Sequence, residues 1–132
     1  MLAAGLKGTA ETKVEEANTA QRVGSGSVDV FATPMLVALV ESAAIHALEG
    51  KLPPGHTTVG THIDLRHLAA TPRGMTVRGE AELLEVKGQR LSFRVEAFDD
   101  VEKVAAGTHQ RYVLEKEAFL ARAKAKAESM GV

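Results

Sequence analysis

Residues 30–49, VFATPMLVALVESAAIHALE, constrain the fold more than any other part of the chain. Eleven of the fifteen residues from 35 to 49 are apolar, and they fall on every side of an α-helix rather than along one stripe. We therefore expect a helix that is surrounded by protein. Thr33 can cap it with its hydroxyl, Pro34 suits the first helical position, and Gly50 ends it. The rest of the chain should fold around this helix.

Glu41 is the exception within this apolar run. An ionised carboxylate is costly to bury unless a partner, a hydrogen bond or protonation accommodates it. Two interpretations are open from the helix alone. The chain turns Glu41 toward an Arg or Lys, or the carboxylate has a function.

The composition excludes several classes of protein. With 132 residues, the chain is long enough for one domain, residues 1–132, with a modest core. Its 16 basic and 17 acidic residues nearly balance, so charge indicates neither nucleic-acid binding nor an anionic membrane surface. The absence of cysteine excludes disulfides, thiolate metal sites and a catalytic thiol. Neither the N-terminal MLAAGLKG nor the central helix has the apolar length of a signal or membrane segment, so we expect a cytoplasmic protein.

Most of the remaining chain alternates in the manner of β-strands. Residues 8–16 alternate weakly and carry charge, which predicts an edge strand, and residues 18–27 are expected to form a loop. Alternation after the helix, with a bulge at Leu83 and Leu84, predicts strands at residues 57–69, 75–86, 91–97 and 104–114. Residues 116–130 predict a terminal amphipathic helix packed at an edge. This order implies an α+β fold in which an antiparallel sheet wraps around one helix.

His67 breaks the sorting of polar and apolar residues in its strand. The odd positions Val59, Ile63 and Leu65 are apolar and should face inward, and His67 shares their parity. A lone histidine on an apolar face is more often structural than catalytic, unless a carboxylate is also inside. Glu41 is the available carboxylate.

Three segments resemble one known family: VFATPMLVALVESA at residues 30–43, VGTHIDLRHLAATPRGM at 59–75 and GTHQRYVL at 107–114. They are similar to the fluoroacetyl-CoA thioesterase family of acyl-CoA hydrolases, which has the hotdog fold. The resemblance covers residues 30–114. It implies an acyl-CoA thioesterase that uses CoA as part of its substrate and needs no further cofactor.

The site pattern of this family falls on five residues here. In the family, a Thr at the start of the hotdog helix, a Glu eight residues later and a His on the next strand form the catalytic group, which the resemblance carries to Thr33, Glu41 and His67. A Gly in the G-T-x-I strand and an Arg in the G-T-H-x-R strand line the acyl pocket and match Gly60 and Arg111. Fluoroacetyl-selective members carry an additional Phe-containing lid before the helix, where this chain has only VGSGSVDVFA. The difference favours a broader or different short acyl group.

Spacing limits how Thr33 and Glu41 can cooperate. Eight helical residues separate their backbones by about 12 Å along the axis and roughly 80° around it, so the side chains cannot touch. Either His67 bridges them, or the working set takes members from two chains. The hotdog resemblance implies paired subunits, and we therefore expect a homodimer with active sites near its interface.

The residues leave several roles open. Glu41 is a candidate base or nucleophile, and His67 can orient it, protonate the departing thiolate or carry a proton from Thr33. Thr33 is a nucleophile, a water-orienting hydroxyl or only a helix cap. Gly60 lets the backbone approach the acyl group or is an ordinary strand glycine at a bulge. Arg111 binds an acyl carboxylate or a CoA phosphate, or it neutralises Glu41.

Other functions rank lower. No H-x-x-x-H or H-E-x-x-H spacing is present, so we predict no metal site. A non-catalytic acyl-CoA binding or sensing domain is the main alternative to a thioesterase. Hydratase chemistry on the same fold ranks last, because no D-x-N-P-x-H element is present.

Overall fold

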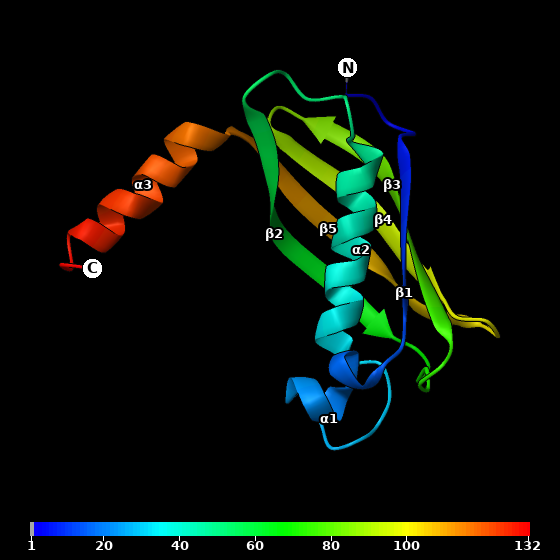
Figure 1. The fold of residues 1–132 in the computed structure, drawn as a ribbon. Helices are drawn as coiled ribbons and strands as arrows, with labels where there is room; N and C mark the ends of the chain where they lie inside the picture. Colours follow the sequence, from blue (N-terminus) through cyan, green and yellow to red (C-terminus); the bar gives the residue numbers. More distant parts are fainter. Residues whose placement is uncertain (1) are drawn as a thin grey trace.

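The structure, a computed structural model, describes residues 2–132. One antiparallel sheet in the order β1-β3-β4-β5-β2 curls around a long helix, α2 (Figure 1). The elements are β1 (Lys7–Lys13), the 3-10 helix η1 (Glu16–Asn18), α1 (Ala20–Val23), α2 (Thr33–Ala47), β2 (His56–His67), β3 (Thr76–Lys87), β4 (Arg90–Phe98), β5 (Lys103–Glu115) and α3 (Lys116–Glu128). The expected α+β arrangement of a sheet around one helix is confirmed. So are the edge position of β1 and the irregularity in β3, whose register shifts between Leu83 and Glu85.

Helix α2 begins at Thr33, one residue earlier than predicted. Ala32 takes the N-cap position, and Pro34 lies in the first turn, where its missing N–H would have had no helical partner. The capping role that the sequence allowed for Thr33 is not realised, because Thr33 is already helical and no side-chain cap hydrogen bond is made. At the other end, Leu48 is the C-cap and Gly50 adopts a left-handed φ of +71°, which stops the helix as expected.

One side of α2 forms the core with the sheet. Its buried residues are Leu36, Leu39, Val40, Ala43, Ala44 and Ala47. Full burial of a Leu or Val side chain contributes about 1.5–3 kcal/mol. The small alanines let β1 approach closely, and a Cβ on Gly8 would lie 2.2 Å from the Ala43 carbonyl oxygen. Only glycine fits there.

The other side of α2 is not covered within the chain. Pro34 and Ala38 are exposed, and Ile45 is 48% exposed. We call these three residues the apolar strip. The expectation that α2 is enclosed on every side is therefore wrong for the single chain, because the sheet covers only one side. Glu41 lies between Ala38 and Ile45 and is half-buried.

A bulge in β2 decides which residues face the helix. Gly60 pairs with Arg111 and His62 pairs with Gln110 of β5, so Thr61 is an extra residue and the alternation changes phase there. His67 faces inward, as predicted. Val59 does not: it lies opposite Tyr112 and lines a surface hollow on the outer side of the sheet. The predicted inward position of Val59 is wrong because the alternation was carried across the bulge.

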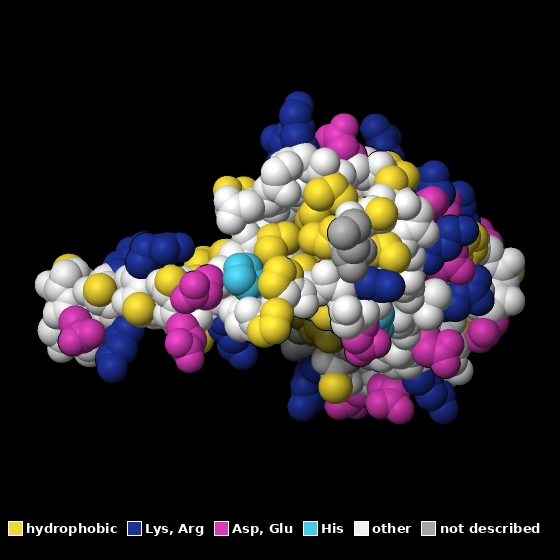
Figure 2. All heavy atoms as spheres, turned by 90° about the horizontal axis from the view of Figure 1, so that it is seen from above, with side chains coloured by type: hydrophobic (Ala, Val, Ile, Leu, Met, Phe, Trp, Pro, Cys, Tyr) yellow, Lys and Arg dark blue, Asp and Glu magenta, His cyan; other side chains and the backbone are white. Residues whose placement is uncertain are grey.

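Two segments differ from expectation. Residues 18–27, expected to be a loop, contain α1, which Thr19 caps by accepting a hydrogen bond from the Arg22 N–H. The terminal helix α3 forms as predicted but does not pack at an edge. It has no buried residue and stands out from the body of the molecule in both views (Figures 1 and 2).

Candidate active site

Thr33 and His67 form the first part of the site. Thr33 is the first residue of α2, His67 is the last residue of β2, and Thr33 Oγ1 lies 2.7 Å from His67 Nδ1. Thr33 is exposed and His67 half-buried. Because the hydroxyl contacts the imidazole and does not cap the helix, the structure removes the capping role that the sequence left open.

The environment of His67 favours the neutral imidazole. Burial lowers its pKa from the ordinary value of 6.5. Its Nε2 atom is also buried and has no hydrogen-bond partner among residues 2–132. A neutral ring with a bare Nδ1 can accept the hydroxyl proton of Thr33.

A hollow opens beside this pair. Its volume is about 410 Å³, and Thr33 and His67 both line it. The remaining wall is made of small and apolar residues from the segment before α2, including Gly26 and Val28, and from residues 68–70 after β2. Phe31, the aromatic residue of this segment, also lines the hollow and is 1% exposed.

Glu41 belongs to a second group. Its Oε2 atom lies 3.4 Å from Arg111 Nη1 and 3.8 Å from His109 Nε2, and its side chain is 35% exposed. A Cβ on Gly60 would lie only 2.4 Å from the same oxygen. Glycine at position 60 therefore makes the space that the carboxylate occupies. Of the two interpretations of Glu41, the arginine partner is present, and the carboxylate is still partly accessible.

Arg111 is fixed from several directions. Nε donates to Thr58 Oγ1 at 2.9 Å, Nη2 donates to the Thr58 carbonyl at 3.2 Å, and Nη1 points toward Glu41 and His109. The residue is only 5% exposed, and burial lowers its pKa, an effect that Glu41 opposes. Thr58 also lines a second hollow of about 310 Å³ at the C-terminal end of α2. Figure 2 views this end of the molecule and shows apolar side chains gathered there.

His109 is the residue that sequence reasoning missed. It was considered only as a possible metal ligand, yet it is 1% exposed and lies between Arg111 and the β2 backbone. The signal was present: His109 is two residues from Arg111 on the same strand and so must share its face. His46 and His56 contact backbone carbonyls of Thr9 and Pro54.

The chain does not bring all five predicted residues together. Thr33 contacts His67, while Glu41 lies with Gly60 and Arg111. Both groups lie between α2 and β2, about 12 Å apart along the helix axis. Glu41 lies near His109 and Arg111. Among residues 2–132, His67 contacts Thr33 but makes no hydrogen bond or ion pair to Glu41, so it does not bridge the two within one chain.

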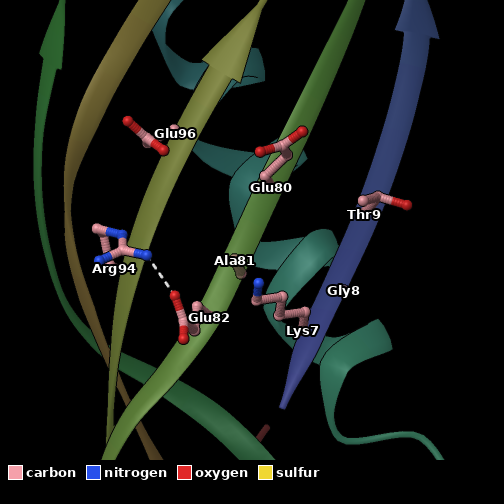
Figure 3. Close-up of a pocket in the computed structure, with 8 residues that line it drawn as sticks. All are labelled: Lys7, Gly8, Thr9, Glu80, Ala81, Glu82, Arg94 and Glu96. Atoms are coloured by element: carbon pink, nitrogen blue, oxygen red, sulfur yellow. Dashed lines mark hydrogen bonds and ion pairs between the residues drawn. The ribbon is translucent and has the colours of Figure 1, made fainter. Parts of the chain in front are cut away.

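A trough on the outer face of the sheet lies apart from this site. It has a volume of about 330 Å³ and crosses β1, β3 and β4 (Figure 3). Glu82 pairs there with Arg94, and Glu96 pairs with Lys103. Cross-strand ion pairs on a solvated face account for these charges.

Two features are absent from residues 2–132. No group of three or more His, Asp or Glu side chains is placed to hold a metal ion. No helix in this part of the chain has both the length and the apolar character needed to cross a membrane.

The fold and these groups define a thioesterase of the hotdog class. A thioesterase superfamily member from Thermus thermophilus has a similar structure, with a TM-score of 0.87, 29% identity and 98% of each chain covered. A hot-dog-like protein from Thermanaerovibrio acidaminovorans shares the fold at 22% identity, with a TM-score of 0.85 over 95% of this chain and 93% of that one.

The family match is more specific. A family model described as fluoroacetyl-CoA-specific thioesterase matches residues 14–117. The fluoroacetyl-CoA thioesterase of Streptantibioticus cattleyicolor is 46% identical over 98 residues, which are 74% of this chain and 70% of that protein. A solved structure of a fluoroacetyl-CoA thioesterase covers 96% of this chain and 98% of its own, with 37% identity and a TM-score of 0.88. The chain belongs to the fluoroacetyl-CoA-specific thioesterase family, which confirms the predicted hotdog fold and acyl-CoA thioesterase activity.

Proposed function

We propose that this protein hydrolyses short-chain acyl-CoA thioesters with Thr33 as nucleophile, His67 as its base and Glu41 as the base that activates water. The observation that supports this most directly is the 2.7 Å contact between the Thr33 hydroxyl and His67 Nδ1 beside a hollow. A nucleophile within hydrogen-bond reach of a base is the arrangement that covalent hydrolysis requires.

The reaction proceeds in two steps. Thr33 Oγ attacks the thioester carbon, its proton passes to His67, the C–S bond breaks, and the CoA thiolate leaves with the proton from His67. Water then adds to the threonyl ester, and Glu41 takes its proton. The C–O bond to Thr33 breaks, the proton held by Glu41 passes to Thr33 Oγ, and the free acid leaves with both groups restored. CoA takes part only as the substrate, and the scheme needs no cofactor.

The hollow beside Thr33 indicates the acyl group. Its mostly small and apolar wall suits an uncharged short chain, and the phenylalanine that lines it, Phe31, is packed in the hydrophobic core. We therefore assign a range of short acyl groups wider than fluoroacetyl. The cytoplasm remains the proposed location, and residues 1–132 the proposed single domain.

A homodimer would bring the two groups of the site together. Val37 lies four residues from both Thr33 and Glu41 and is half-buried. A two-fold axis near Val37 would place Thr33 of each subunit beside Glu41 of the other, because the axis reverses the direction of α2. The apolar strip and the unpaired edge of β2 lie on this side and offer a surface to a second copy.

Mixing two inactive variants tests both the roles and the shared site. Thr33→Ala and Glu41→Gln should each lower kcat by about 10²–10⁴-fold on acetyl- to hexanoyl-CoA, because each removes a group that moves a proton or attacks. Thr33→Ser keeps the hydroxyl and should retain much of the rate. Exposed Glu85 supplies the matched control, Glu85→Gln, which should act like the unmodified protein.

In a mixed dimer, one site carries both substitutions and the other carries neither. Random mixing after joint refolding should restore about a quarter of the unmodified activity, since about half of the dimers are mixed and each has one intact site. Release of CoA is followed with a thiol-reactive dye, and dimer mass by light scattering. Dimers that mix without regaining activity would contradict the shared site, and an unchanged rate in Glu41→Gln would contradict the role of Glu41.

A further inference from the structure

We propose that His109 is a positioning residue, whose Nε2 lone pair holds the Arg111 guanidinium in place beside Glu41. This inference rests on the proposed role of Glu41 in thioester hydrolysis. His109 itself does not reach the substrate in this scheme and acts through Arg111.

The hydrogen bonds of His109 determine its tautomer. Nδ1 lies 2.7 Å from the His62 carbonyl oxygen, and a carbonyl only accepts, so Nδ1 carries the proton. Nε2 lies 3.1 Å from Arg111 Nη1, and a guanidinium only donates, so Nε2 must be bare. Burial is the main cause that lowers the pKa of His109, and the positive charge of Arg111 adds to it, which keeps the ring neutral.

The β2 bulge makes this tautomer possible. The carbonyl that accepts from Nδ1 belongs to His62, the first residue to pair with β5 after the extra Thr61. Phe93 of β4 also lies against the ring, with centroids 6.1 Å apart and a tilt of 30°. The imidazole is therefore restrained from both sides, and it presents Nε2 in one direction.

Arg111 needs this acceptor. Thr58 accepts from its Nε and Nη2 atoms, while Nη1 has, among residues 2–132, only His109 Nε2 at 3.1 Å and Glu41 Oε2 at 3.4 Å. Without His109, the sole contact holding Nη1 would be the long one to the carboxylate. A buried donor left short of acceptors moves to find another, and Glu41 would then lose its fixed partner.

Two amide substitutions separate the two nitrogen positions of the ring. Gln reaches the position of Nε2, so His109→Gln keeps an acceptor for Arg111 but loses the donor to His62. Asn reaches only the position of Nδ1, so His109→Asn keeps the donor and loses the acceptor. A displaced catalytic partner can reduce the rate by about 100-fold, so His109→Asn should lower kcat about 10- to 100-fold with little change in KM. His109→Gln should recover most of the rate.

A double-mutant cycle shows whether the effect passes through Arg111. In an Arg111→Met background, His109→Asn should lower kcat no further, because the group it positions is gone. Equal rates for the Asn and Gln variants, or additive losses in the cycle, would overturn the inference. Urea unfolding confirms that each variant is folded at the assay temperature. The control is Glu41→Gln: if that variant is inactive while the His109 variants behave alike, only the role of His109 fails.

Discussion

At the scale of single residues, a substitution of Gly60 should affect activity much more than stability. A Cβ at this position would meet Glu41 Oε2 at 2.4 Å, while its next contacts, His109 and Arg111, are at 3.2 and 3.3 Å. The near atom is the end of a flexible side chain, so Gly60→Ala can be accommodated by moving the carboxylate. We expect kcat to fall by about 100-fold and the free energy of unfolding to change by less than about 1 kcal/mol. Thioesterase assays and urea unfolding of the same preparation measure both.

A large loss of stability in Gly60→Ala, or full activity, would show that the glycine does not serve the carboxylate. Ile63→Val is the matched control, since Ile63 lies on the same strand and packs against the hydrophobic core. It should lower stability by about 0.5–1.5 kcal/mol and leave kcat nearly unchanged.

The motifs in the sequence predicted most residues of the site, but not that these residues form two separate groups. The family pattern pointed to Thr33, Glu41 and His67, and the structure places Thr33 against His67. Glu41 instead lies near a different histidine, His109 of β5. Strand alternation shows which residues share a face, but it does not show which of them lies opposite a given position of α2. His109 was missed because a histidine near an arginine on a strand has no motif of its own.

At the scale of elements, the contact of β1 with α2 depends on glycine. A Cβ on Gly8 would meet backbone atoms of Ala43 and Ala47 at 2.2 and 2.3 Å, and neither atom can move without shifting the helix. We expect Gly8→Ala to lower the free energy of unfolding by about 1–3 kcal/mol, the range for overpacking a core. Gly26→Ala is the control, because its Cβ would make an ordinary 3.4 Å contact with Ala20. Thermal and urea unfolding compare the two, and equal stabilities would contradict the packing.

Element positions were predictable where one face of the element is buried. The alternation predicted β4, in which every second residue is buried, because this strand lies inside the sheet. It failed for Val59, where an extra residue shifts the phase, and for α3, whose composition predicts a helix but not its neighbour. Helix propensity is local, whereas docking depends on a complementary surface.

At the scale of the whole molecule, the half-buried His67 and the buried His109 make the free energy of unfolding depend on pH. Burial lowers the pKa of both His67 and His109 below the ordinary value of 6.5. The unfolded chain therefore binds more protons than the folded chain just below pH 6.5, and the free energy of unfolding must fall as the pH drops. We expect lower stability at pH 5 than at pH 7 in urea unfolding.

Replacing His109 by Gln should make this pH dependence shallower, because one of the two linked groups no longer titrates. The comparison uses the difference between pH 7 and pH 5, so a constant loss of stability in the variant does not affect it. A stability that rises on acidification in the unmodified protein would contradict the lowered values.

The extra residue in β2 also affects how relatives should be aligned. Before Thr61, the even-numbered residues Thr58 and Gly60 face the group around Glu41. After Thr61, the odd-numbered residues Ile63 and His67 face the helix. A related sequence with a one-residue deletion between Gly60 and Ile63 would keep every motif letter elsewhere, yet it would turn one of these pairs away from α2. The length of this short interval is therefore a better marker of an intact site than the identity of Thr61.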